Sequence, residues 1–240
     1  MMIEDLINND SGKKYVILDG EKFFNLISQC PSLCNFEKCD RNDLQIFCES
    51  ILFNFENEQK LGEHNFYKKL QSTCKIKYKL ICGHTKIVKH NFFFNIYKIN
   101  KKQGIQEQID SYQAGKFING TTFQLCLECM ETIDVDSIFY EYTELPDVFF
   151  LEIERGYIDD YGNLKFYDDE INVDEKIVIN NVSYTLESFI NYNNMHYSAV
   201  IKKSEEFYNI NNTKLNKINR SDAFKLANIY GRMIIYTKIS

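Results

Sequence analysis

The fold is decided by three segments, LPDVFFLEIERG at residues 145–156, NMHYSAVIKK at 194–203 and FYNINNTKL at 207–215. In the second segment, His196 and every second residue after it alternate with Tyr, Ala and Ile, which predicts a strand with two different faces. The third segment follows after only a few residues around Ser204. We therefore predict a hairpin of two antiparallel strands with His196 near one strand end.

The predicted hairpin gives His196 a polar partner. With the turn centred on Ser204, the residue opposite the histidine lies between Asn211 and Thr213. Opposed Cβ atoms in an antiparallel pair are about 4.5–5.5 Å apart, so an Asn oxygen can accept a hydrogen bond from the imidazole. An oriented histidine is half of a nucleophilic site. The alternative is a half-exposed histidine that only forms part of an Asn-rich hairpin.

These segments together resemble the ubiquitin-specific protease family. The first is similar to its Leu-Pro-x-Val-Leu-x-x-x-Leu-x-Arg-Phe strand, the second to its Gly-Gly-His-Tyr-x-Ala-Tyr histidine box, and the third to its Trp-Tyr-x-Phe-Asp-Asp-Ser-x-Val strand. The closing YGRMIIYTK at 230–238 is similar to the family ending Ala-Tyr-x-Leu-Phe-Tyr. The motifs occur in the family's order.

The resemblance implies an α+β class and a papain-like ubiquitin-specific protease fold. Its parts would be an antiparallel palm sheet, a fingers subdomain and a reduced helical thumb. We expect the thumb helices at residues 1–62, the fingers at 63–144 and the palm with the histidine box at 145–240, within one structural domain. The clearest helix pattern runs from Asp40 to Asn57, with apolar residues at helical spacing.

Two predicted turns carry candidate metal ligands. One hairpin turns at Cys82 and His84, and the other turns at the C-x-x-C pair Cys126 and Cys129. Cysteine and histidine on two turns are how a structural zinc ion is usually bound, with four ligands in tetrahedral geometry. The family usually has a second C-x-x-C, but Lys79 stands at its first cysteine. We take His84 as the substitute ligand and predict one structural zinc ion.

Two alternatives to that ligand set stay open. Cys74 or His90 can replace His84 as the fourth ligand. The two turns can also pack together without any metal.

The resemblance also assigns the remaining site residues. His196 matches the catalytic histidine, while Asn211 matches the usual acid and Asn212 the residue after it. Asp43 matches the first of two acids that hold the ubiquitin tail, and Ile46 replaces the second. Ubiquitin-tail binding is therefore expected to be weakened, because one charge-assisted partner for arginine is missing.

The expected nucleophile is absent from the sequence. The family carries it in a Gly-x-x-Asn-x-Gly-Asn-Thr-Cys-x-x-Asn box near the start of its domain, and no cysteine of this chain lies in such a box. Cys30 and Cys34 follow no Gly-Asn turn. Histidine activates a thiolate but does not replace it.

Composition limits the partners and the compartment. The formal net charge is −6 and the pI is about 5.4, which disfavours direct nucleic-acid binding through bulk electrostatics. We expect no membrane association, because no long apolar run exists and the N-terminus is acidic. Eight cysteines without a secretory signal indicate thiols or metal ligands, so we expect an intracellular protein, cytoplasmic or nuclear.

The favoured interpretation is a catalytically inactive ubiquitin-specific-protease-like domain. It would bind ubiquitin, a ubiquitinated protein or other subunits of a multiprotein complex. One alternative is an active ubiquitin carboxyl-terminal hydrolase whose nucleophile segment lies outside this chain. Another is a scaffold without ubiquitin affinity, in an RNA-processing or other complex.

Overall fold

A computed structural model of the 240-residue chain describes residues 70–92, 94–98, 103–115, 123–158, 164–166, 170–193, 196–212 and 214–239. All of them belong to one compact unit, Lys68–Ser240. The reduced thumb expected at 1–62, including the Asp43 helix, lies outside the described residues.

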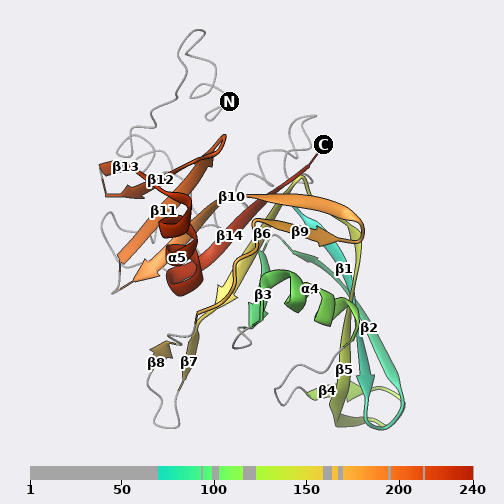
Figure 1. Ribbon diagram of the computed structural model, residues 1–240. Helices are drawn as coiled ribbons and strands as arrows, with labels where there is room; N and C mark the ends of the chain where they lie inside the picture. Colours follow the sequence, from blue (N-terminus) through green and yellow to red (C-terminus); the bar gives the residue numbers. More distant parts are fainter. Residues whose placement is uncertain are drawn as a thin grey trace, which may run out of the picture. The chain divides into compact units, whose positions relative to one another are not determined.

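The described residues form strands joined by short turns, with two helices (Figure 1). The elements are β1 (Ser72–Leu80), β2 (Thr85–Phe92), β3 (Phe94–Lys98), α4 (Ile105–Gln113), β4 (Phe123–Cys126), β5 (Glu131–Glu144), β6 (Val148–Glu154), β7 (Gly156–Ile158), β8 (Leu164–Phe166), β9 (Lys176–Ile179), β10 (Val182–Asn193), β11 (His196–Lys203), β12 (Glu206–Asn211), β13 (Lys214–Ile218), α5 (Arg220–Tyr230) and β14 (Gly231–Lys238).

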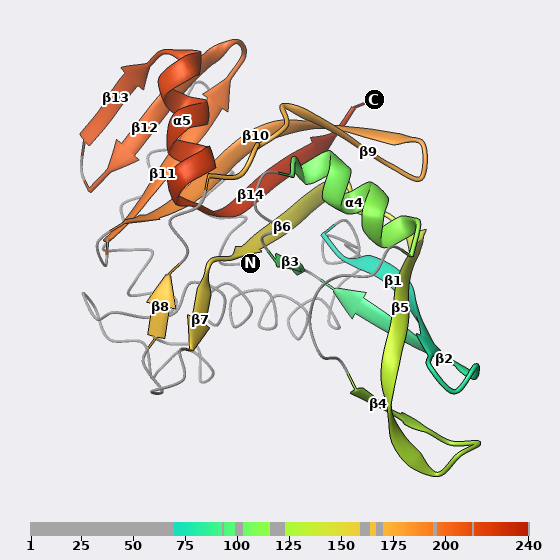
Figure 2. The same ribbon diagram turned by 60° about the horizontal axis from the view of Figure 1, so that its bottom comes forward.

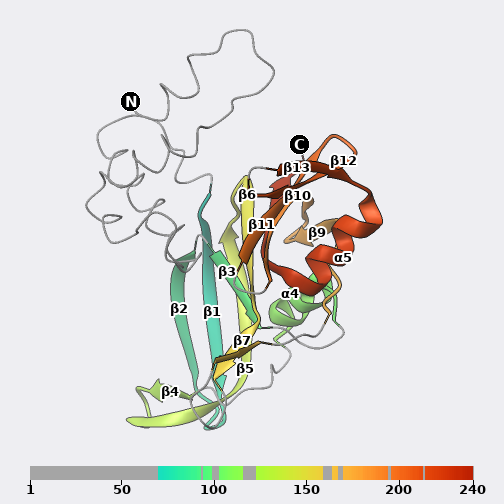
Figure 3. The same ribbon diagram turned by 90° about the vertical axis from the view of Figure 1, so that its left-hand side faces the viewer.

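Two sheets organise this unit. The smaller is antiparallel, with strand order β2-β1-β5-β4, and both of its hairpin turns lie at the same end (Figure 3). The larger has eight strands, in the order β13-β12-β11-β10-β14-β6-β3 with β9 paired to β10. It is antiparallel except that β3 runs parallel to β6. β7 and β8 form a separate two-stranded hairpin.

The main hydrophobic core lies against the larger sheet. Alternate residues of β6, Phe149, Leu151 and Ile153, are almost completely inaccessible, as the strand's period of two requires for a buried face. Tyr184 of β10 packs on Phe149 and donates its hydroxyl hydrogen to the Pro146 carbonyl at 2.7 Å. The LPDVFFLEIERG segment therefore provides a central strand and the turn that fixes its start.

Residues 100–120 are mostly polar, a composition that predicts a surface loop. This prediction is wrong for helix α4, where Ile105, Ile109 and Tyr112 are buried at helical spacing. The ring of Tyr112 meets the edge of the Tyr140 ring at a centroid distance of 4.8 Å. This segment therefore closes the core between the two sheets.

Helix α5 lies on one face of the larger sheet (Figure 2). Ala223 and Ala227 are completely buried against the sheet, and such small side chains allow close approach of the helix. The buried Arg155 donates to the carbonyls of Asn228 at 2.6 Å and Gly231 at 2.9 Å. Cations at a helix C-terminus offset the partial negative charge of its free carbonyls.

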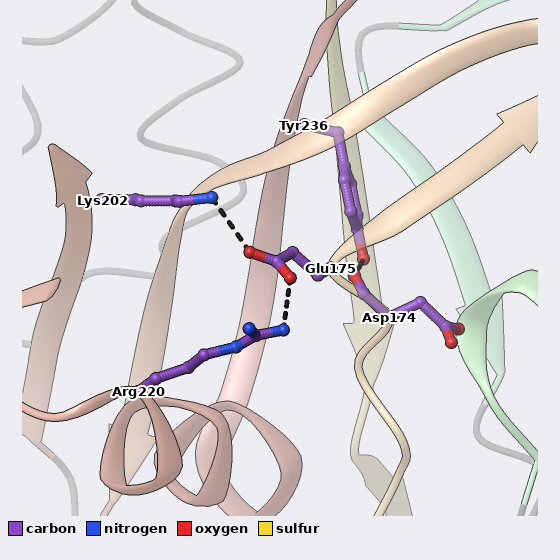
Figure 4. Close-up of polar contacts among 5 residues, drawn as sticks. All are labelled: Asp174, Glu175, Lys202, Arg220 and Tyr236. Atoms are coloured by element: carbon purple, nitrogen blue, oxygen red, sulfur yellow. Dashed lines mark hydrogen bonds and ion pairs between the residues drawn. The ribbon is translucent and has the colours of Figure 1, made fainter. Parts of the chain in front are cut away.

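Glu175 ties α5 to the histidine-bearing strand β11. Its carboxylate accepts a hydrogen bond from Lys202 at 3.0 Å and pairs with Arg220 at the start of α5 (Figure 4). The hydrogen bond from Lys202, together with the nearby Lys202 and Arg220 charges, lowers the pKa of Glu175. The preceding residue, Asp174, accepts the Tyr236 hydroxyl through its carbonyl and the Gln106 amide of α4 through its carboxylate. One short segment thus joins both helices to the sheet.

The predicted α+β class is wrong for the described part of the chain. These residues are predominantly β, and their two helices pack singly on sheet faces instead of forming a helical subdomain. The expectation rested on helices in residues 1–62, which lie outside the described residues. Neither described helix is long and apolar enough to cross a membrane.

Candidate metal centre and histidine site

The hairpin of β11 and β12 brings His196 and Asn211 together. The strands turn at Ser204, whose φ of 55° lies in the left-handed region. Because Ala199 opposes Ile210, Asn211 continues the register opposite Ser198 and shares its sheet face with His196. His196 Nε2 lies 2.8 Å from Asn211 Oδ1, which is hydrogen-bond distance.

This hydrogen bond orients the imidazole. The Asn oxygen can only accept, so Nε2 carries the proton and Nδ1 of the neutral ring is left as an acceptor. Such an Nδ1 can take a proton from a thiol, and Asn orients the histidine in papain-like sites. Asn211 is uncharged, however, and gives an imidazolium less stabilisation than a carboxylate does. Both side chains are exposed.

Asn212 has a different position from Asn211. It forms the turn between β12 and β13 with a φ of 53°, a conformation that Asn tolerates better than most residues. The 207–215 segment, expected to be the second strand of one hairpin, is therefore two strands with a sharp reversal between them.

A buried amide that the sequence reasoning missed lies in the next strand. Asn191 of β10 opposes Ser198 in the register and is 2 % exposed. Among the described residues, neither its side-chain oxygen nor its nitrogen has a hydrogen-bond partner. An unsatisfied buried polar group costs about 1–3 kcal/mol. Asn191 is in phase with the buried Phe189, but Asn is usually an exposed residue and β10 carries several other polar residues, so the sequence did not indicate this burial.

The described cysteines are not placed to serve His196. Cys74 points into the core from β1 with no exposed surface, and burial raises the pKa of its thiol to about 12. The other three described cysteines belong to turns of the four-stranded sheet. The previously considered Cys30 and Cys34 lie outside the described residues.

The metal ligands come from two tight turns. In the β1–β2 turn, the Leu80 amide donates to the His84 carbonyl at 2.9 Å, and Gly83 supplies the left-handed conformation with a φ of 86°. In the β4–β5 turn, the Cys129 amide donates to Cys126 Sγ at 3.4 Å. These backbone bonds point the ligands of both turns to one position.

The ligand atoms of Cys82, His84, Cys126 and Cys129 all lie within 4.8 Å of one another. His84 Nδ1 is 3.5 Å from Cys82 Sγ and 3.4 Å from each of the other sulfurs, and the Cys82 and Cys126 sulfurs are 3.8 Å apart. A tetrahedral zinc site with ordinary bond lengths has sulfur–sulfur edges of about 3.8 Å and sulfur–nitrogen edges of about 3.6 Å. One imidazole N–H cannot satisfy three sulfurs, whereas one central cation can.

The close approach of the thiols shifts their titration in opposite directions. Hydrogen bonding from the Cys129 backbone lowers the pKa of Cys126 to about 7, whereas the hydrogen bond with Cys126 raises the pKa of Cys129 to about 12. The thiolate is the form that binds metal, so Cys126 is the ligand that is most easily deprotonated. The alternative ligands Cys74 and His90 face each other across β1 and β2, away from the cluster, and His90 stacks on Phe92. The four predicted residues therefore form a cluster that can bind one zinc ion.

Comparison with known proteins finds similarity in fold to solved structures. No family model matches the chain, and no curated protein matches it either. Among solved structures, it is similar to the SAGA Ubp8/Sgf11/Sus1/Sgf73 DUB module, with a TM-score of 0.69 and 17% identity over 95% of this chain and 56% of the matched chain. A second structure, of that module bound to monoubiquitin, gives a TM-score of 0.59 and 18% identity over 82% and 46%.

The chain spans about half the length of the chains that it matches. At this identity the likeness concerns the fold alone. The expected ubiquitin-specific-protease-like fold is supported, and the activity is a separate question.

Proposed function

We propose that these 240 residues form a deubiquitinase-like module that binds ubiquitin or a ubiquitinated protein within a multiprotein complex and does not hydrolyse it. This proposal rests mainly on one observation: Asn211 orients His196, while every described thiol is either in the core or in the metal cluster. The sequence also contains no Gly-Asn-Thr-Cys box. A general base without its thiol cannot form an acyl-enzyme.

The binding part of the proposal is supported by the similar structures. One of them holds monoubiquitin, and both are modules of several subunits. A fold that binds ubiquitin can keep its binding surface after its nucleophile is lost. In this proposal the metal cluster keeps the end of the four-stranded sheet rigid, and Asp43 contributes to holding the ubiquitin tail.

A second candidate function is ubiquitin hydrolysis with a nucleophile from outside the described residues. The 2.8 Å bond between His196 and Asn211 favours it, because a catalytic histidine needs this orientation. The two functions differ in covalent chemistry, so one reagent separates them.

The experiment uses a ubiquitin whose C-terminus carries a thiol-reactive group. We expect no covalent adduct with the 240-residue chain, because no thiol among the described residues faces His196 and the sequence has no Gly-Asn-Thr-Cys box. The matched variants are His196→Ala and His90→Ala, which each remove one exposed imidazole. An adduct that His196→Ala abolishes and His90→Ala leaves unchanged would establish the hydrolase instead.

Ubiquitin affinity is measured separately by calorimetry. We expect a dissociation constant of about 1 mM or tighter, weakened by Asp43→Ala. Absence of heat with ubiquitin at about 1 mM, together with no adduct, would leave only the scaffold without ubiquitin affinity.

A further inference from the structure

Exposed hydrophobic side chains gather near the metal cluster. Of the ten large hydrophobic residues that are exposed in the described part of the chain, six lie at this end of the four-stranded sheet. Single exposed apolar residues need no explanation, but a gathered set marks an interaction surface. Five of the six form what we call the knuckle patch, namely Ile81, Phe123, Leu125, Leu127 and Met130.

The strand register places three members of the patch on the same face of the four-stranded sheet. The Ile81 amide donates to the Asp134 carbonyl at 3.1 Å, and Asp134 is the register partner of Phe123. Leu125 opposes Thr132, two residues further along both strands. Opposed residues and every second residue share a sheet face. Ile81, Phe123 and Leu125 therefore surround Asp134 on the same side of the sheet.

The metal-binding turn supplies the other two members. Leu127 lies between the two cysteine ligands and is 73% exposed, and Met130 directly follows the second ligand and is 76% exposed. The backbone of Met130 is left-handed, with a φ of 56°. Glycine or asparagine is the usual residue there. The other described non-glycine residues with positive φ are Asn180, Asn181, Ser204 and Asn212, all short and polar.

Met130 is thus unfavourable for the turn and contributes little to folding. A strained residue that nothing in the turn requires indicates a role outside folding. Methionine is flexible and polarizable, which suits contact with a partner surface.

The charge of this region is negative. Asp134 lies within the patch, and Glu128 is exposed in the turn beside Leu127. The nearby Lys79 is paired with Asp136, and Lys86 donates to Gln124 on the opposite face. One zinc ion on three thiolates and a neutral imidazole would add one net negative charge. A complementary partner would therefore be positive as well as apolar.

We propose that the knuckle patch docks a segment of a partner protein that combines aliphatic or aromatic side chains with Lys or Arg. The apolar side chains pack on Phe123, Leu125 and Leu127, and a cation pairs with Asp134. This docking goes beyond the proposed ubiquitin binding. It gives the module a second attachment point.

The test uses fluorescence anisotropy with two synthetic amphipathic peptides of equal length, one of Leu and Lys and one of Leu and Glu. The zinc-loaded 240-residue chain should bind the Leu/Lys peptide at least about tenfold more tightly. Leu127→Ser and Met130→Gly should each weaken binding about tenfold. Asp134→Asn should weaken it about threefold.

Matched controls remove the general effects of charge and exposed apolar area. Asp147→Asn removes one exposed acid from the start of the larger sheet, and Leu215→Ser removes an exposed leucine from β13. Both should bind the peptide as the unaltered chain does. Met130→Gly separates docking from folding, because glycine at this φ should raise stability while it weakens binding.

Three results would overturn the proposal. They are equal affinity for the two peptides, no anisotropy change with the Leu/Lys peptide at about 1 mM, and equal losses of affinity in the patch variants and the controls.

Discussion

The two candidate sites differ in how complete they are. At the metal end of the four-stranded sheet, two turns supply four ligands whose spacing matches one tetrahedral ion. At the histidine end of the larger sheet, one hairpin supplies an oriented imidazole, but no described thiol accompanies it. A metal site stabilises the fold that carries it, whereas a catalytic pair does not. The comparison predicts large structural effects at the first site and small ones at the second.

Loss of the metal should have the largest effect. Cys126→Ser removes the most buried ligand, so we expect zinc content to fall from about one equivalent to near zero and the melting temperature to fall by more than about 5 °C. Metal analysis and calorimetry measure both. Cys74→Val is the matched control, because it replaces a buried thiol outside the metal cluster by an apolar side chain of similar volume. The zinc content of this variant should stay at about one equivalent. Unaltered zinc content in Cys126→Ser would show that the four residues are not one site.

Breaking the Glu175 ion pairs should have the next largest effect, this time between β11 of the larger sheet and helix α5. Glu175 is about three-quarters buried, and Glu175→Gln leaves Lys202, which is 12% exposed, without its carboxylate. We expect a loss of about 2 kcal/mol of unfolding free energy, measured by urea denaturation. A loss below about 0.5 kcal/mol would mean that solvent screens the pair.

The same carboxylate predicts a pH dependence. Its pKa is lower in the folded chain than the ordinary value of 4.5, so the folded state binds the proton less well than the unfolded state. The stabilisation is therefore fully present above the ordinary pKa and is lost as the pH falls through the lowered folded value. The stability difference between the unaltered chain and Glu175→Gln should be constant near pH 7 and shrink below pH 4.5.

Local patterns predicted the hairpin that pairs His196 with Asn211 and each of the two metal turns, because each is formed by residues close in sequence. The meeting of the two turns is a contact between segments more than 40 residues apart, which local spacing does not fix. Helix α4 was missed because its buried residues stand in a polar segment, although Ile105, Ile109 and Tyr112 have helical spacing. The burial of Asn191 depends on β14, some 40 residues away, and no local pattern reports it.

A substitution of Asn191 tests whether this buried amide, near the histidine end of the larger sheet, is hydrogen-bonded in solution. If its amide has no partner in solution, Asn191→Leu should raise the unfolding free energy by about 1 kcal/mol, because an unsatisfied buried amide is replaced by an apolar group of similar size. Chemical denaturation measures the change, and Ser188→Ala, on the same strand, is the control. Destabilisation by Asn191→Leu would instead show that the amide is hydrogen-bonded in solution.

The smallest effect is expected at the pair that first indicated the fold. Asn211→Ala removes one hydrogen bond between two exposed side chains, so the unfolding free energy should change by less than about 0.5 kcal/mol. The ring should respond even though the stability does not, because Asn211 fixes the proton on Nε2. Nitrogen NMR of His196 should therefore show one dominant tautomer in the unaltered chain and a mixture in Asn211→Ala. Identical spectra of the unaltered chain and Asn211→Ala would mean that the hairpin backbone, and not the Asn211 amide, orients the imidazole. Asn211 would then have no part in placing the histidine for catalysis.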